Sequence, residues 1–405
     1  MFFPMRRGPG FLLFLLLILF FSISLNAQES ILSSYERNFI RAGLGAKVGI
    51  LADAATDERA GEFIADLYDF ALRFARDNSG YLRDDPEMIA LVGAAARGAG
   101  AAGSTASLNT LWELFNVYRD SYSRVEILGS LGRLGKGSRP VIRNLNQYLD
   151  DQNSAYKRAN PGQSYGGIVD YAVLSACIAA LGALGDDSSF PYLFSTMTAG
   201  YPQNVAQETL KALESIHGNY SDYLLDVIRR NPYPEKAAAF RIGAYNERLS
   251  ASDRGKIALA ALEVSLGSSS GYGPAESSLR YDAVTVLTRL KWSPAAAAAI
   301  RNFYQVRSDY EMGTASKERL IEAVALLGAM GSAEAAQALA LQLGYLNSQT
   351  EHSGEYDEAL ILAIVNSLGE LGDKAAFDYL LYISYLNYPD RIQAAAREAL
   401  NRLRW

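Results

Sequence analysis

The sequence is poor in the residues that most often carry chemistry. It has one cysteine, Cys177, and two histidines, His217 and His352. A single cysteine excludes an intramolecular disulfide framework, and its place far from the N-terminus excludes a lipid-modified cysteine at a cleavage site. Two isolated histidines offer few general bases and form no paired Cys or His metal motif. No catalytic, cofactor or metal site is therefore expected, and Cys177 is predicted to be a small buried core residue.

Blocks of positive charge are also missing. The 38 lysine and arginine residues are scattered among 44 acidic residues, and the formal net charge is -6. Nucleic-acid binding depends on clustered basic side chains that neutralise phosphates. A nucleic-acid partner is not expected.

Long apolar runs are confined to the N-terminus. Basic residues there precede an uncharged apolar run over residues 11–25, and a polar stretch follows Ala27. This order is typical of a secretory signal peptide, and the run is shorter than the roughly 20 residues that span a bilayer as a helix. We predict a signal peptide over residues 1–27 and a periplasmic or otherwise extracytoplasmic protein. Because Leu25 is imperfect at the minus-three position, an uncleaved signal anchor is the alternative.

An internal repeat dominates the rest of the sequence. Four copies of a Leu-Gly-x-Leu/Met-Gly motif each end one apolar helical pattern and precede another: Leu131–Gly135, Leu181–Gly185, Leu327–Gly331 and Leu368–Gly372. The last glycine can adopt the left-handed C-cap conformation, and Asp186 or Asp373 can then cap the next helix. The motif predicts a tight helix-turn-helix corner, in which the first glycine permits close approach of helices.

Weaker copies keep the apolar spacing and lose the glycines. They lie near Ile216, Leu290 and Leu403, with a degenerate unit at residues 236–266 and two further first helices at Val48–Leu51 and Ile89–Val92. Most steps between copies are about 30 to 50 residues, the range of helical-repeat proteins. The sequence thus predicts an all-α protein. Residues 28–405 would form a single α-solenoid domain of about nine helix pairs and a C-terminal capping helix.

The corners and periods resemble HEAT-like repeats. The resemblance is strongest to the short, armadillo-like variety also found in phycobilin lyases, which has an Ala-Leu-Gly-x-Leu-Gly-Asp corner followed by Ala and Pro. It covers most of residues 40–405 and is clear in four units. It implies a right-handed superhelix of stacked antiparallel helix pairs, with the second helices along a concave face. Lyase activity is not implied, because these repeats occur in many unrelated scaffolds.

The longer irregular segments are predicted after second helices, at residues 150–167, 267–277, 308–316 and 347–356. Insertions on one edge of a solenoid commonly belong to its binding side, and tyrosine among Gly, Ser and Asn suits partner contacts. The candidate partner-binding residues are tyrosines of these segments and of a late second helix: Tyr156, Tyr165, Tyr272, Tyr310, Tyr356, Tyr382 and Tyr385. Simple connections, and core packing for the helical tyrosines, are the alternatives.

Three local patterns match functional motifs without the required context. Gly98–Gly103 fits a dinucleotide fingerprint, but no strand and helix alternation surrounds it. Gly267–Gly271 fits a nucleophile elbow, but it lies in a Ser and Gly run after a helix. His352 lies among three carboxylates, for which a solvated acidic loop is a simpler explanation than a metal site.

The predicted function is a non-catalytic exported scaffold. It would bind a protein or peptide of the cell envelope through its concave face and its loop-bearing edge. One alternative is an envelope spacer that touches the membrane only through an uncleaved N-terminal segment. Another is an enzyme or small-ligand carrier, which would need a cluster of buried titratable groups in the groove.

Overall fold

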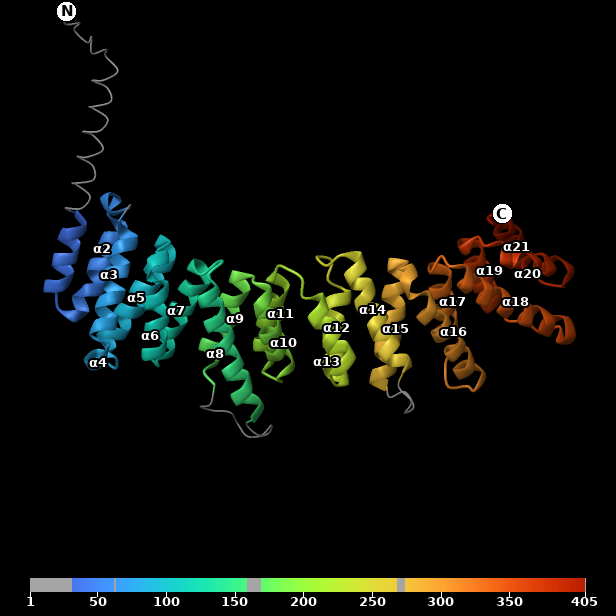
Figure 1. The fold of residues 1–405 in the computed structure, drawn as a ribbon, viewed down its shortest axis with the longest axis horizontal. Helices are drawn as coiled ribbons and strands as arrows, with labels where there is room; N and C mark the ends of the chain where they lie inside the picture. The colour runs from blue at the N-terminus through green and yellow to red at the C-terminus, as the bar shows by residue number, and fades with distance from the viewer. Residues whose placement is uncertain (1–30, 62, 159–168, 268–273, 405) are drawn as a thin grey trace, which may run out of the picture. The chain divides into compact units, whose positions relative to one another are not determined.

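The computed structural model describes residues 31–61, 63–158, 169–267 and 274–404 (Figure 1). These residues are predominantly helical and contain no β-strand, only one isolated bridge between Asp373 and Arg404. The prediction of an all-α fold is confirmed. The predicted signal peptide lies outside the described residues. Among the helices that are described, none is both long and apolar enough to cross a membrane.

The chain divides into two compact units, and the division falls between Gly218 and Asn219. After a helix at residues 31–41, unit 1 contains α2 Leu44–Thr56, α3 Ile64–Asp77, α4 Ser79–Leu82, α5 Pro86–Ala102, α6 Leu108–Val117, α7 Ser121–Leu134, α8 Arg139–Arg158, α9 Tyr171–Leu184, α10 Phe190–Thr198 and α11 Gln203–Ser215. Unit 2 contains α12 Ser221–Arg230, α13 Tyr233–Ala244, α14 Ala251–Leu266, α15 Pro274–Leu290, α16 Ala296–Glu311, α17 Lys317–Ala329, α18 Ala333–Ser353, α19 Glu358–Leu371, α20 Phe377–Tyr382 and α21 Asp390–Asn401. That the units form one domain stays a prediction.

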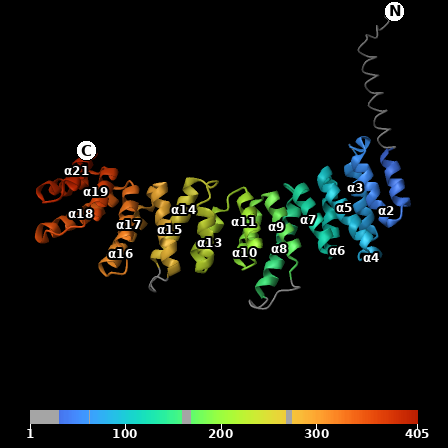
Figure 2. The same cartoon turned by 180° about the vertical axis from the view of Figure 1, so that it is seen from behind.

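Within each unit the helices stack in chain order, which is a solenoid arrangement. First helices, which end at a corner, pack on one another: α5, α7, α9 and then α11 in unit 1, and α15, α17, α19 and then α21 in unit 2. The second helices α8 and α10 pack together, as do α16, α18 and α20 (Figures 1 and 2). The right-handed turn of the repeats stays a prediction.

The corners have the predicted chemistry. Gly185 and Gly372 adopt left-handed conformations, with φ of 66° and 65°, which residues with a Cβ atom adopt only at a cost. The side chains of Asp186 and Asp373 each accept a backbone N–H from two residues further on, at 3.0 and 2.8 Å. Each therefore caps a short 3-10 turn that leads into the second helix.

One corner differs from the prediction. Gly135 has φ of -83°, and the left-handed residue is Gly137, with φ of 77°. The reason is an extra turn: the N–H of Gly135 donates to the Leu131 carbonyl and the N–H of Ser138 donates to the Gly135 carbonyl, both at 2.9 Å. The chain therefore reverses two residues later than predicted.

The first glycine of the motif allows neighbouring helices to touch. A Cβ atom built on Gly132 would lie 2.8 Å from the Cα atom of Ala180 on α9. One built on Gly182 would lie 3.0 Å from the Cα atom of Ala212 on α11. Both distances are shorter than a carbon–carbon contact of about 3.5 to 4.0 Å. The predicted close approach of helices is confirmed.

The two units repeat one arrangement of helices, which the sequence analysis did not recognise. In order, the helix at residues 31–41, α2, α3 and α5 to α11 correspond to α12 to α21. Helices α5 and α15 each contain 17 residues and begin at Pro86 and Pro274. The 3-10 turn Thr105–Ser107 recurs as Ser293–Ala295 at the same offset. Unit 2 is thus a second copy of the fold of unit 1.

Buried hydrogen bonds between second helices recur with the helices. In unit 1, Nδ2 of Asn153 on α8 donates to the carbonyl of Tyr192 on α10, at 3.2 Å. In unit 2, Nδ2 of Asn347 on α18 donates to the carbonyl of Tyr379 on α20, at 3.1 Å. Both asparagines follow a left-handed glycine, Gly137 or Gly331, by the same number of residues. The asparagines therefore hold equivalent places.

A lysine that donates to a backbone carbonyl shows that the first parts of the units also correspond. Nζ of Lys47 donates to the carbonyl of Phe39, and Nζ of Lys236 donates to the carbonyl of Ile228 at 2.7 Å. Each carbonyl lies eight positions before its lysine. Desolvation lowers the pKa of both ammonium groups. The same hydrogen bond from lysine to a backbone carbonyl thus occurs in both units.

Alkaline pH is expected to destabilise unit 1. Burial raises the pKa of Tyr118, Tyr148 and Cys177 to about 12, from 10.0 for the two phenols and 9.0 for the thiol. The unfolded chain therefore loses these protons first, so stability is complete below about pH 9 and falls as pH rises towards 12. Urea unfolding at pH 8 and pH 11 measures the loss, which we expect to be on the order of 1 kcal/mol for Tyr118 alone.

The matched variant is Tyr118→Phe. The Tyr118 hydroxyl has no hydrogen-bond partner in the described part of the chain, so the variant should fold normally at pH 8 and lose less stability at pH 11. Equal losses in the variant and the original protein would contradict the assignment.

Candidate functional site

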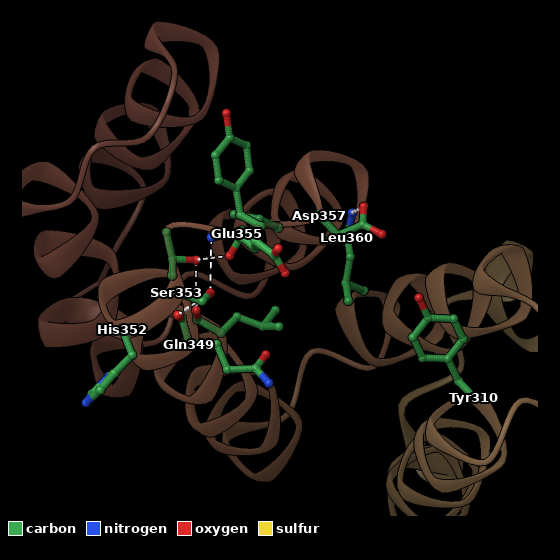
Figure 3. Close-up of a pocket in the computed structure, with 11 residues that line it drawn as sticks. Tyr310, Gln349, His352, Ser353, Glu355, Asp357 and Leu360 are labelled. Atoms are coloured by element: carbon green, nitrogen blue, oxygen red, sulfur yellow. Dashed lines mark hydrogen bonds between the residues drawn. The ribbon is translucent and has the colours of Figure 1, made fainter.

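A cleft of about 610 Å³ lies at one edge of unit 2, where α18 ends and α19 begins. The last turn of α18 and the first turn of α19 form most of it, and Tyr310 from the end of α16 lies across from Leu360 (Figure 3). Two of the predicted partner-binding tyrosines, Tyr310 and Tyr356, line this cleft.

A short turn between α18 and α19 shapes the cleft. Gly354 ends α18 in the left-handed conformation, with φ of 73°. The side chain of Asp357 then accepts the N–H of Leu360 at 3.2 Å and caps α19. Its other oxygen lies 3.1 Å from Nζ of Lys317, at the start of α17. The cleft therefore has a fixed acidic rim that is partly neutralised.

The polar groups of the cleft mostly bond to each other. Oγ1 of Thr350 donates to the carbonyls of Leu346 and Glu355, at 3.0 and 3.2 Å. Nδ1 of His352 lies 2.7 Å from the Ser348 carbonyl, within its own helix. Across the described ranges, no group of three or more His, Cys, Asp or Glu side chains is arranged to hold a metal ion. The polar groups of the cleft are therefore largely engaged within the protein itself.

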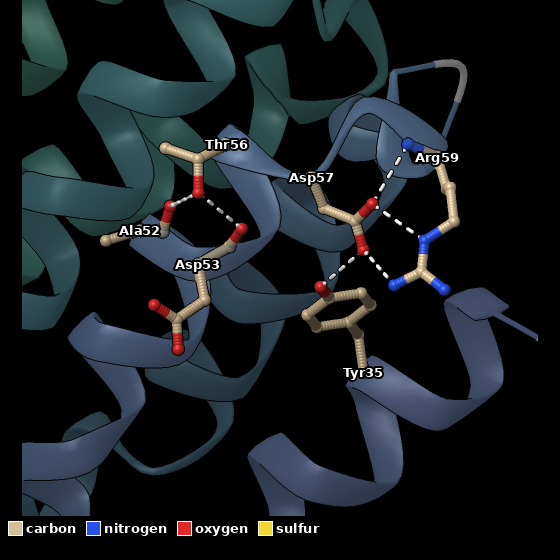
Figure 4. A network of polar contacts seen from close by, with 6 residues as sticks. All are labelled: Tyr35, Ala52, Asp53, Thr56, Asp57 and Arg59. Atoms are coloured by element: carbon tan, nitrogen blue, oxygen red, sulfur yellow. Dashed lines mark hydrogen bonds and ion pairs between the residues drawn. The ribbon is translucent and has the colours of Figure 1, made fainter.

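A polar network in unit 1 forms a local cap (Figure 4). Tyr35 donates its hydroxyl to Asp57 at 2.9 Å, and Arg59 donates to both oxygens of the same carboxylate at 2.9 and 2.8 Å. The hydrogen bonds from Arg59 hold the pKa of the Asp57 carboxyl far below its usual range. Asp57 is thus fully engaged in joining α2 to the next turn.

The predicted irregular segments after the second helices are partly wrong. Helix α8 continues to Arg158, α16 to Glu311 and α18 to Ser353. The Asn and Ser residues in the segments predicted to be irregular favour a loop by local propensity. Tertiary packing overrides that preference, because Asn153 and Asn347 are buried against the next second helix. The edge of unit 2 at these segments is therefore built mainly on helix ends.

Tyr156 lies on α8 and not in a loop. Only 9% of it is exposed. Its ring stacks on that of Tyr201, with centroids 3.9 Å apart, and its hydroxyl donates to the Gly200 carbonyl at 3.0 Å. These contacts pack the side chain into unit 1. Two other predicted residues, Tyr165 and Tyr272, lie outside the described residues.

The remaining predicted tyrosines are in unit 2. Tyr356 packs edge-on against the buried Tyr388, with ring centroids 5.5 Å apart. Tyr382 ends α20, and Tyr385 ends the 3-10 turn that follows. Their rings are 6.3 Å apart, and Tyr382 donates its hydroxyl to Oε1 of Glu351 on α18 at 3.0 Å. Tyr385 is 74% exposed and Tyr382 is 39% exposed, so both reach solvent.

Neither a protein-family model nor a curated protein matches this chain. The resemblance to HEAT-like repeats thus stays a prediction that depends on the corner motif. The candidate site depends on the geometry of unit 2 alone.

Sequence reasoning missed part of the exposed apolar surface. Tyr304 on α16, and Leu341 and Tyr345 on α18, are exposed on second helices that pack side by side. Tyr304 and Leu341 line an apolar groove of about 430 Å³. We call Tyr304, Leu341, Tyr345, Tyr382 and Tyr385 the tyrosine face. No local sequence signal indicates it, because Tyr304 and Leu341 fit the apolar period of a core-facing helix.

The glycine-rich stretch Gly98–Gly103 ends α5 and is explained by packing. A Cβ atom on Gly98 would overlap the ring of Tyr68, and one on Gly100 would lie 2.5 Å from Oγ of Ser130. The stretch thus brings neighbouring helices together. Most of the other pattern, Gly267–Gly271, lies outside the described residues.

Proposed function

We propose that the protein is a non-catalytic scaffold that binds a protein or peptide partner, and that unit 2 carries the binding surface. The observation that supports this proposal is the tyrosine face, five large apolar side chains exposed on neighbouring second helices and on the turn that follows the last of them. Exposed aromatic side chains that gather in one place are typical anchors of protein interfaces, whereas scattered ones need no explanation.

The proposed location is extracytoplasmic. Support comes from the N-terminal sequence, in which Arg6 and Arg7 precede the apolar run of residues 11–25. The partner would then be a component of the cell envelope.

Photo-crosslinking in intact cells tests the binding surface. We expect a photoreactive phenylalanine at Tyr345 or Tyr385 to form the same adduct with one partner. Tyr81 in unit 1 is the control, because it is 97% exposed and lies outside unit 2. Adducts of equal yield from all three positions, or none from Tyr345 and Tyr385, would contradict the proposal.

A further inference from the structure

The residues of the tyrosine face come from three second helices that pack side by side and from the turn after the last one. Tyr304 lies on α16, Leu341 and Tyr345 on α18, and Tyr382 at the end of α20. Helix α18 packs against both α16 and α20. Tyr304 and Leu341 line an apolar groove, and the ring of Tyr385 is exposed on the turn that follows α20.

Unit 1 has the same order of helices but lacks the exposed apolar side chains of the tyrosine face. Counted from the corner glycines, the five positions of the tyrosine face correspond in unit 1 to polar residues: Asn116, Gln147, Asp151, Ser195 and Thr198. The buried asparagine and its carbonyl partner are kept in both units. The exposed tyrosines are thus not needed to build the fold. Their presence in unit 2 alone favours a role in binding, because exposed apolar surface otherwise promotes aggregation.

The charge also reverses between the two units at the end of this face. In unit 1, Nζ of Lys157 donates to Oγ of Ser195 at 2.9 Å. The equivalent pair in unit 2 is Glu351 and Tyr382, in which the Glu351 carboxylate accepts the Tyr382 hydroxyl at 3.0 Å. One helical turn before Tyr382, the exposed Asp378 stands where unit 1 has Pro191. Two carboxylates therefore accompany the tyrosines at this end.

Beside Tyr345 the face has an arginine that is paired with a carboxylate. Arg307 lies over the ring of Tyr345, 5.9 Å from its centroid, and donates to Glu311 and Gln342 at 3.0 and 2.9 Å. A cation is attracted to the faces of tyrosine rings and to carboxylates, and is repelled by a guanidinium. The rings of Tyr382 and Tyr385, together with the Glu351 and Asp378 carboxylates, therefore offer groups that attract a cation.

We propose that the tyrosine face binds a peptide segment of a partner protein that presents apolar side chains followed by a lysine or arginine. The apolar side chains occupy the groove beside Tyr304 and Leu341. The basic group lies against Tyr382 and Tyr385, where the Glu351 carboxylate neutralises it. This inference depends on the proposed function and specifies the chemistry of the partner.

Selection from a random peptide library displayed on phage, with the mature full-length protein as bait, tests this chemistry. We expect enriched peptides in which an apolar stretch is followed by Lys or Arg. Synthetic copies of the enriched peptides should bind a variant carrying Glu351→Lys and Tyr382→Ser at least about tenfold more weakly, because cation–π and carboxylate contacts are lost together. The variant takes its residues from unit 1, and both positions are exposed, so its thermal unfolding should be unchanged.

The matched control makes the opposite exchange, Lys157→Glu with Ser195→Tyr, and should leave binding of the selected peptides unchanged. Enriched peptides without a basic residue, or equal binding to the Glu351→Lys variant, would overturn this inference but leave the proposed scaffold function standing. No enriched peptides together with no crosslinks from Tyr345 and Tyr385 would instead contradict the scaffold function itself. Sedimentation that shows self-association of the protein, lost in the variant, would identify a second copy as the occupant and would also overturn the inference.

Discussion

Gly132→Ala is expected to destabilise the protein by about 1 to 3 kcal/mol, the usual cost of overpacking a core. The new methyl group would lie 2.8 Å from the Cα atom of Ala180, so helices α7 and α9 would have to separate. A backbone atom cannot move aside as the end of a flexible side chain can. The strain would therefore spread along the stack of first helices in unit 1.

Gly129→Ala is the matched control, three residues earlier on the same helix. A Cβ atom there meets nothing within 4 Å. Alanine has a higher helix propensity than glycine, so this variant should be more stable by about 0.5 to 1 kcal/mol. Urea unfolding of both variants measures the difference. Stabilisation by both substitutions would show that helix propensity, not close packing, governs these glycines.

Asn347→Ala is expected to cost about 2 to 3 kcal/mol. The buried side chain donates to the Tyr379 carbonyl at 3.1 Å and accepts the hydroxyl of Tyr388, also at 3.1 Å. Its removal leaves the carbonyl without this donor in a region closed to solvent, and an unpaired buried group costs about 1 to 3 kcal/mol. The packing of α18 against α20 should loosen, which amide hydrogen exchange in α20 would detect.

Ser348→Ala supplies the comparison, because Ser348 is the next residue and its side chain is exposed. Its free energy of unfolding should stay within about 0.5 kcal/mol of that of the original protein. If Asn347→Ala were equally harmless, the repeated asparagine would not be a structural element of the second helices, and the correspondence with Asn153 would lose its physical meaning.

The sequence was sufficient for the elements whose ends are defined by local chemistry. Glycine and aspartate at the corners terminate and cap helices over a few residues, so Gly185 with Asp186 and Gly372 with Asp373 could be read directly. The ends of the second helices could not. The residues there are polar by type but pair with the next helix, and Asn153 becomes buried only after that helix has packed.

The duplication was hidden because backbone shape is kept where residue type is not. The corner after α5 has Gly103 with φ of 74°, and the equivalent corner after α15 has Lys291 with φ of 48°. A lysine in this conformation is uncommon, so the sequence pattern treats the second corner as a degenerate copy. Only the helix bounds and the recurring hydrogen bonds show the two corners to be the same.

Only part of the candidate site could be predicted from the sequence. Tyr382 and Tyr385 were selected from their spacing of three residues, which places some rings of such a series on the surface. Tyr304 and Leu341 fit the apolar period of an ordinary core-facing helix. Periodicity cannot tell whether a neighbouring element covers such a residue, because that depends on contacts distant in the sequence.

The presence of two copies of one fold in a single chain changes how its surface can evolve. Core positions in both copies obey the same packing rules, so mutations there are selected against in either copy. Outward positions are under no such common rule, and one copy can keep an inert, soluble exterior while the other acquires a recognition surface. Unit 1 has polar residues such as Asn116 and Gln147 at positions where unit 2 has exposed aromatic and apolar side chains. This difference fits the proposal that unit 2 alone acquired a surface for recognition.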